Sequence, residues 1–90
     1  MANRKSPTAD EYKQQVLSWF RIAKQRGSTH MIIAFDTTKQ NPFPVYVGSD
    51  ISVQTKIKSF NDNAFTRAIE VYNMRMDRDK QLGQARTWNV

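Results

Sequence analysis

Few residues in this 90-residue chain have a type and spacing that could do chemistry. The chain has no Cys and a single His, which excludes a thiol nucleophile, a disulfide framework and a metal site built on Cys or a His pair. His30 and Asp36 share one side of an expected strand, but about 20 Å of strand separates them, too far for an acid–base pair. Asp36 and Thr37 alone supply too few oxygens for magnesium. We therefore expect no enzyme, no metal site and no cofactor.

The charge of the chain is a stronger signal than its chemistry. Fourteen Lys and Arg residues oppose eight Asp and Glu residues, which gives a formal net charge of +6 and a pI near 10.0. Residues 1–30 hold six of the basic and two of the acidic residues, so this third alone carries 6 − 2 = +4. Such a field attracts nucleic acids, nucleotides, phospholipid head groups or acidic proteins. The composition favours an anionic partner without choosing among these classes.

Two groups of basic residues are the candidate phosphate contacts. The first group lies within an arc of about 80° on one expected helix and consists of Lys13, Arg21 and Lys24. The second group shares a later expected helix and consists of Arg67, Arg75 and Arg78. A solvated surface is the alternative interpretation of both groups, because Lys and Arg normally lie outside.

A mixed apolar and aromatic set forms the candidate partner surface. Val71 and Met74 lie between arginines of the second group, and a face that combines Arg with apolar side chains suits a protein partner. Phe43, Tyr46 and Trp88 could stack on bases or anchor a protein if they are exposed. The alternative for Val71 and Met74 is packing against the preceding helix.

A long first helix over residues 9–26 is expected to position the first basic group. Thr8 and Glu11 have the spacing of a capping box, in which each side chain bonds a free backbone N–H of the other. Apolar residues then recur at helical spacing, and Gly27 is a natural stop.

A β-hairpin is expected next. Residues 30–36 are apolar on both faces, as in a covered strand. Residues 37–44 are polar and contain two prolines, which predicts a loop, and residues 45–47 form a short second strand that ends at Gly48. The short connection favours antiparallel pairing of the two strands.

Two more helices are expected after the hairpin. The second helix begins after Ser49 or Asp50, and its apolar stripe consists of Val53, Ile57 and Phe60. The third helix begins after Asp62 or Asn63 and ends near Gly83, and its apolar stripe consists of Phe65, Ala68, Ile69, Tyr72 and Met76. The tail, residues 85–90, has the composition of a strand and could add a third strand to the sheet.

These elements predict an α+β fold in the order α-β-β-α-α-(β). A small antiparallel sheet packs against about three helices, which lie on one of its faces. Residues 1–7 are expected to be a disordered basic arm, and residues 8–90 a single domain. No apolar run approaches the length of a membrane span, and no secretion signal is seen in the first thirty residues, so we expect a cytoplasmic protein with no membrane partner.

One stretch of the sequence resembles a known group. His30-Met31-Ile32-Ile33-Ala34-Phe35-Asp36-Thr37, followed by Pro44-Val45-Tyr46-Val47, resembles a group of small uncharacterised proteins encoded by bacteriophages and bacterial genomes. The C-terminal part is similar to that group too, at Glu70-Val71-Tyr72, Asp79 and Gln81-Leu82, so the resemblance covers about residues 28–89. It implies a phage-type accessory protein, without implying an activity. In that group the loop between the two motifs is often acidic and aromatic, whereas residues 38–43 here are basic and neutral, so no carboxylate role carries over to this loop.

The sequence thus leads to a functional hypothesis with two rivals. We expect a non-enzymatic binder of a phosphate-bearing ligand, nucleic acid or nucleotide, that serves counter-defence or host takeover in the host cytoplasm. The first rival is an inhibitor or adaptor that binds a host protein. The second is a homo-oligomer in which the short sheet continues across subunits.

Overall fold

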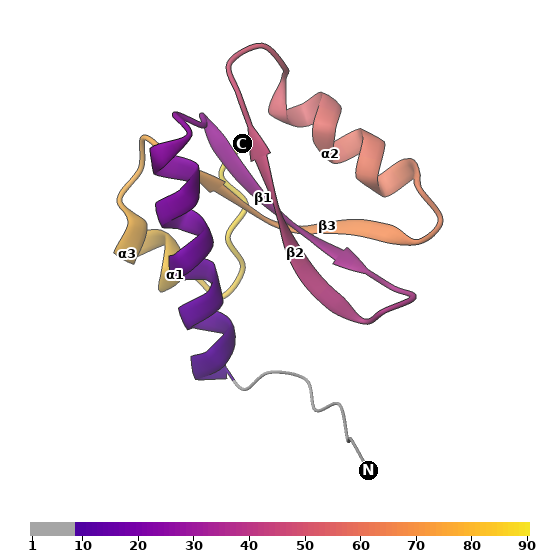
Figure 1. The fold of residues 1–90 in the computed structure, drawn as a ribbon, viewed down its shortest axis with the longest axis horizontal. Coiled ribbons are helices and arrows are strands. Elements are labelled where there is room, and N and C mark those ends of the chain that lie inside the picture. Colours follow the sequence, from indigo (N-terminus) through magenta and orange to yellow (C-terminus); the bar gives the residue numbers. More distant parts are fainter. Residues whose placement is uncertain (1–8) are drawn as a thin grey trace.

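A three-stranded antiparallel sheet with helices on both faces forms the molecule (Figure 1). The structure is a computed structural model that describes residues 9–90. The expected arm over residues 1–7 and the Thr8 half of the expected capping box lie outside the described residues. None of the helices within residues 9–90 has the length and apolar character needed to cross a membrane.

Helix α1 (Ala9–Gln25) matches the expected first helix to within one residue. Asp10 and Glu11 in its first turn and Lys24 in its last turn have the charges that the helix dipole favours at each end. Gly27 ends the helix with a φ of 69°, a left-handed conformation that glycine adopts without steric cost. The backbone N–H of the next residue, Ser28, closes the end by donating to Ala23 O at 3.0 Å.

The central strand β1 (His30–Asp36) pairs with β2 (Asn41–Val47) as the expected antiparallel hairpin. The connection is shorter than the expected loop over residues 37–44, because Pro42 and Pro44 lie within β2. They are tolerated because β2 is an edge strand, where a missing N–H donor need not break the ladder. The Asp36 carboxylate shapes the tight turn by accepting from the N–H groups of the two residues that follow Thr37.

Strand β3 (Thr66–Asn73) replaces most of the expected third helix, so that expectation is wrong. β3 pairs antiparallel with β1, and a register shift between Ile33 and Ala34 leaves Ile69 unpaired as a bulge. Ala68 and Val71 pack in the apolar cluster on one face of the sheet, whereas Ile69 and Tyr72 pack in the cluster on the other. The bulge therefore gives apolar residues a spacing of three in a strand, which imitates the period of a helix.

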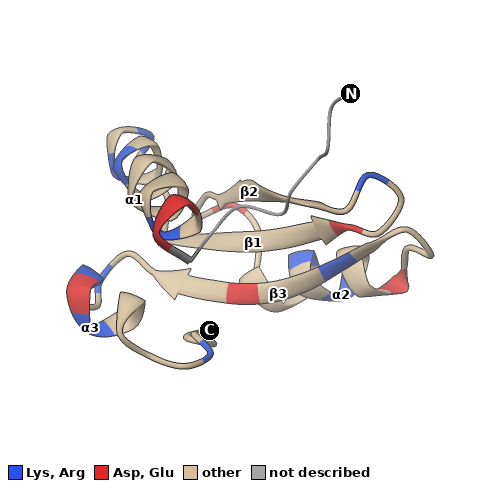
Figure 2. Ribbon diagram, turned by 90° about the horizontal axis from the view of Figure 1, so that it is seen from below, with Lys and Arg blue, Asp and Glu red and all other residues tan. Residues whose placement is uncertain are grey.

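The helices cover both faces of the sheet rather than one, which corrects a second expectation (Figure 2). Val16 and Phe20 of α1 pack on Met31 and its neighbours on one face. Helix α2 (Val53–Asp62) packs on the other face through Val53 and Ile57. Its cap is Ser52, two or three residues later than expected. Coverage from both sides follows from a central strand that is apolar on both faces.

The chain ends in a short helix and a tail that closes one sheet edge. Helix α3 (Arg78–Leu82) begins at Asp77, whose carboxylate accepts from Lys80 N at 2.9 Å. The tail meets β3 where Val71 N donates to Thr87 O and Asn89 N donates to Val71 O, both at 2.9 Å. This contact is a single parallel bridge and not the third strand expected at residues 85–90. The α+β class, with three helices and an antiparallel sheet, is confirmed in the order α-β-β-α-β-α.

A buried glutamine joins α3 to the end of β3. Gln81 is 0 % exposed, and its amide uses all of its bonding capacity. Its Oε1 accepts from Asn73 N at 2.8 Å and Asn89 Nδ2 at 3.0 Å, and its Nε2 donates to Asn73 O at 2.9 Å and Met76 O at 3.3 Å. Thr87 Oγ1 also donates to the backbone oxygen of Gln81. One side chain thereby connects strand, helix, loop and tail.

Replacing this glutamine should destabilise the fold strongly. We expect Gln81→Ala to lower the free energy of unfolding by about 2–4 kcal/mol, because it leaves backbone groups of residues 73 and 76 without their partner. The matched control is Gln54→Ala on the exposed side of α2, for which we expect a change within about 0.5 kcal/mol. Urea unfolding followed by circular dichroism measures both. Equal losses in the two variants would contradict the role given to Gln81.

Candidate functional site: a basic groove between α1 and α3

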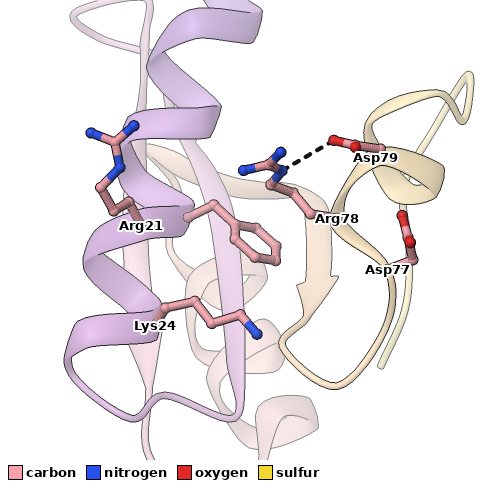
Figure 3. A pocket seen from close by; sticks show the side chains of 6 residues that line it. Arg21, Lys24, Asp77, Arg78 and Asp79 are labelled. Atoms are coloured by element: carbon pink, nitrogen blue, oxygen red, sulfur yellow. Dashed lines mark hydrogen bonds and ion pairs between the residues drawn. The ribbon is translucent and has the colours of Figure 1, made fainter.

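A groove of about 380 Å³ lies between α1 and the start of α3 (Figure 3). Phe20, Arg21 and Lys24 line it from α1, and Asp77, Arg78 and Asp79 line it from the other side. In Figure 3 the Lys24 ammonium and the Arg78 guanidinium extend into the space between the two elements, and Arg21 points to the outer side of the helix. The fold therefore brings Lys24 of the first basic group together with Arg78 of the second, and Arg21 lines the groove with its guanidinium on the outer side of α1.

The cations of the groove keep most of their hydrogen-bond donors. Lys24 Nζ donates to Met74 O at 3.3 Å and lies 6.0 Å from the centre of the Phe20 ring, so it uses one of its three N–H groups. Arg78 bonds Asp79 Oδ1 through Nε at 3.1 Å, and its terminal nitrogens have no hydrogen bond to another of the described residues. No hydrogen bond or ion pair joins Arg21 to another residue within 9–90. These free N–H groups suit an oxyanion, which accepts several bonds at once.

Two carboxylates in the lining of the groove partly neutralise its positive charge. Asp77 is engaged with the backbone at the start of α3, and Asp79 pairs with Arg78. Three cations against two anions leave the lining with a charge of 3 − 2 = +1. The Arg78–Asp79 pair is exposed on both sides, and such pairs contribute little to stability and open readily. Breaking the Arg78–Asp79 pair so that Arg78 bonds a ligand phosphate therefore costs little free energy.

A carboxylate between two tyrosines anchors the first half of α1 to the sheet. Tyr12 Oη of α1 donates to Glu70 Oε1 of β3, and Tyr72 Oη donates to the same oxygen at 3.4 Å. Burial, together with the hydrogen bond and negative charge of Glu70, raises the pKa of Tyr12. Burial and the Glu70 charge raise the pKa of Tyr72 to about 12. This contact holds α1, and with it one wall of the groove, against β3.

The remaining candidate phosphate contacts lie away from the groove. Lys13 is exposed on α1, about 12 Å before Arg21 along the helix axis. Arg67 lies at the opposite end of β3 from α3, because it pairs with Phe35 near the end of β1. Arg75 lines a different cavity. The two groups expected from the sequence are thus divided by the fold, and only Arg21, Lys24 and Arg78 come together.

The prediction of a partner surface is wrong for two of its residues, Val71 and Met74. Val71 is 0 % and Met74 is 7 % exposed, because Val71 in β3 and Met74 directly after it pack in the apolar clusters on opposite faces of the sheet. Phe43 is half-buried against Phe60 of α2, with ring centres 6.0 Å apart. Tyr46 and Trp88 keep exposed area, but a guanidinium lies over each ring, Arg26 at 4.6 Å and Arg86 at 5.2 Å. The aromatic residues therefore stay available only in part.

Sequence reasoning missed the carboxylates and the shape of the groove. The expected third helix runs through Asp77 and Asp79 toward Gly83, whereas in the structure Asp77 is the residue at which a new helix begins. The available signal was Asp77 followed by Asp79, because Asp is a favoured N-cap residue and negative charge is favoured in the first turn of a helix. No sequence signal joins this run to Lys24, since the contact depends on the course of β3.

Comparisons with protein-family models, with curated proteins and with solved structures find no match for this chain. The interpretation of the groove therefore depends on its own geometry and charge.

Tyr12 and Tyr72 should make the fold less stable as the pH rises into the alkaline range. Because the pKa values of Tyr12 and Tyr72 are raised above 10.0, the unfolded chain loses phenol protons first as the pH rises. The contribution to stability is therefore full below pH 10 and falls between pH 10 and about 12. Thermal unfolding across this range should show the fall, and Tyr72→Phe should reduce it. The control Tyr46→Phe should keep most of it, and an unchanged profile in Tyr72→Phe would contradict the assignment.

Proposed function

We propose that this protein is a non-enzymatic binder of a phosphate-bearing ligand, nucleic acid or nucleotide, which it holds in the α1–α3 groove. The observation that carries the proposal is the meeting of Lys24 from α1 with Arg78 from α3 across one groove, with Arg21 at its outer edge. Each of these side chains keeps N–H groups that no described residue uses, and phosphate oxygens are strong acceptors for such donors.

The shape of the groove favours recognition of phosphate over recognition of bases. Its volume of about 380 Å³ is at the small end for ligand sites. Phe20 is only 3 % exposed, so its ring offers little area on which a base could stack. The ligand is therefore recognised by phosphate and its immediate surroundings, which predicts binding with little dependence on base sequence.

The biological role that we propose follows from the resemblance of residues 28–89 to the phage group. A small basic protein of this kind would act in the host cytoplasm on a nucleic acid or nucleotide used by the host or its defence. Counter-defence and host takeover are the two roles that we propose for such binding.

Two alternatives remain, with different support. A protein partner has a specific feature in its favour, because Trp88 is 38 % exposed beneath Arg86, and Trp and Arg are frequent anchors of interfaces. A homo-oligomer formed by extending the sheet has less support. Prolines in β2 weaken one sheet edge as a pairing template, and the tail residues 87–89 occupy part of the other.

Neutralising the groove should remove binding. We expect the triple variant Arg21→Gln, Lys24→Gln, Arg78→Gln to lose most of its affinity for a labelled single-stranded oligonucleotide in fluorescence anisotropy. With three phosphate contacts, the wild-type log–log salt slope should be about −2, so affinity should fall about 16-fold between about 50 and 200 mM salt. The triple variant should show a much flatter salt dependence.

The matched control removes the same charge elsewhere. Lys39→Gln, Lys56→Gln and Arg67→Gln together lower the net charge by three without touching the groove. We expect this variant to stay within about threefold of the wild-type affinity, with the remaining loss due to the general field. Equal losses in both triple variants, or tight binding that is indifferent to salt, would overturn the proposed function. A protein retained from nuclease-treated lysate through Trp88 would favour the first alternative.

A further inference from the structure

The α1–α3 groove carries hydrogen-bond acceptors as well as cations, and the acceptors narrow the class of ligand that it can hold. Lys24 and Arg78 present N–H donors to the groove, whereas the lining residues Asp77 and Asp79 present carboxylate oxygens. A ligand that satisfies both kinds of group needs acceptor oxygens and at least one hydrogen-bond donor. A bare phosphate dianion supplies only the acceptors.

The two carboxylates of the groove differ in their freedom to bond a ligand. Asp77 accepts from Lys80 N at 2.9 Å as the cap of α3, so its side chain is committed to the fold. The Asp79 side chain accepts from Arg78 Nε at 3.1 Å and makes no other hydrogen bond to a described residue. It is 77 % exposed, and in Figure 3 its carboxylate points toward the Arg78 guanidinium. Asp79 is therefore the carboxylate that can bond a ligand while Arg78 bonds a phosphate beside it.

A nucleic-acid backbone offers a donor to a carboxylate only when its sugar is ribose. The deoxyribose–phosphate chain of DNA has acceptor oxygens and no hydrogen-bond donor along the chain, whereas each ribose of RNA has one free hydroxyl, at the 2′ position. This hydroxyl stands on the carbon next to the one that bears the 3′ phosphate. Carboxylate side chains bond ribose hydroxyls in nucleotide sites. The adjacent guanidinium and carboxylate of Arg78 and Asp79 match this adjacent phosphate and hydroxyl.

The same carboxylate disfavours a sugar without the hydroxyl. A bound DNA strand would bring a phosphate close to Asp79 with no donor to bond the carboxylate, and like charges at short distance repel. With RNA, the 2′-hydroxyl can donate to Asp79 and offset the repulsion. A base is poorly placed to supply the donor instead, because Phe20 is only 3 % exposed and gives a base little area on which to stack. Attraction to one sugar and repulsion of the other together produce selectivity between close analogues.

We propose that the α1–α3 groove selects ribose over deoxyribose, and this proposal rests on the phosphate-binding function proposed for the groove. Lys24 and Arg78 bind the phosphate oxygens, and Asp79 accepts a hydrogen bond from the 2′-hydroxyl of the adjoining ribose. The ligand is thus a ribose phosphate with a free 2′-hydroxyl, which an RNA strand or a ribonucleotide supplies.

Single strands that differ only in the sugar test this selection. Fluorescence anisotropy compares labelled strands of uridine, 2′-deoxyuridine and 2′-fluorouridine, which share length, base and charge. We expect the uridine strand to bind at least about fivefold more tightly than the deoxyuridine strand, because it alone forms the charge-assisted hydrogen bond at this exposed site. The 2′-fluoro strand keeps a ribose-like sugar conformation without a 2′ donor, so it should bind like the deoxyuridine strand.

Uridine 3′-monophosphate distinguishes the two sources of ligand. This nucleotide has the 2′-hydroxyl beside its phosphate, and its 2′-deoxy form is the matched control. Displacement of the uridine strand by the ribonucleotide, with weaker displacement by the deoxy form, assigns the groove to a free ribonucleotide. If neither form displaces a strand that is bound with the expected sugar preference, the groove is assigned to RNA. Equal displacement by the two forms would overturn the proposal.

A matched pair of variants tests whether Asp79 reads the sugar. Asp79→Ala should bring the affinities for the uridine and deoxyuridine strands within about twofold of each other, partly because the deoxyuridine strand binds more tightly once the repulsion is removed. Asp62→Ala removes the same charge from an exposed ion pair on α2, where Asp62 lies 2.9 Å from Lys58 and does not line the groove. This control should keep the sugar preference, and circular dichroism checks that both variants fold.

Failure of this proposal is distinguishable from failure of the proposed function. Equal wild-type affinities for the uridine and deoxyuridine strands, both lost in the triple variant Arg21→Gln, Lys24→Gln, Arg78→Gln, would overturn the sugar selection and leave the proposed function intact. A sugar preference that persists in Asp79→Ala, or that the 2′-fluoro strand shares, would overturn the role of the carboxylate. Absence of binding to every strand would overturn the proposed function and the sugar selection together.

Discussion

The architecture of both cavities depends on the side-chain amide of Gln81. A buried amide is unfavourable unless its donors and acceptor are satisfied, and here the amide makes four hydrogen bonds. Two of them repeat the pattern of a strand pair with the backbone of Asn73, at the end of β3. The Gln81 amide therefore makes the two hydrogen bonds with Asn73 that the backbone of a neighbouring strand would make. It continues the sheet where the chain itself turns away.

This bonding determines the course of the loop from β3 to α3. Met76 O is held by Gln81, and Met74 N donates to Thr29 O at 3.0 Å at the start of β1. With both ends of the loop held, Arg75 lies at the cavity beside His30 and Arg78 lies at the groove beside α1. Two arginines only three residues apart thereby line two separate cavities. A single constraint thus links the α1–α3 groove to the cavity beside His30.

The sequence was sufficient for the elements whose local pattern is unambiguous. The span of α1, the covered strand β1 and its hairpin partner follow from helical spacing, from apolar runs and from glycine at an end. β3 was mistaken for a helix because the bulge at Ile69 gives apolar residues the wrong period. The same error led to the wrong prediction that Val71 and Met74, which are buried, lie on the surface. A local sequence pattern cannot predict this bulge, because the bulge depends on how β3 pairs with β1.

The candidate site was predictable residue by residue but not as an assembly. Arg21, Lys24 and Arg78 stand out as basic residues on helices. Their meeting depends on β3, which the sequence pattern predicts as a helix, and on Gln81. The polar side chain of Gln81 gives no sign in the sequence that it is buried. The cavity beside His30 has the same origin, since its lining comes from four separate parts of the chain. In such a small fold, tertiary hydrogen bonds decide the sites more than any motif does.

The most direct test of this account is an amide NMR titration of the intact protein with a single-stranded oligonucleotide. If α1 and α3 form one site, residues 21–24 and 77–80 shift together, in a single titration with one dissociation constant. Shifts confined to one of these two segments, or binding that leaves both unperturbed, would contradict the claim that the fold joins them into one phosphate-binding groove.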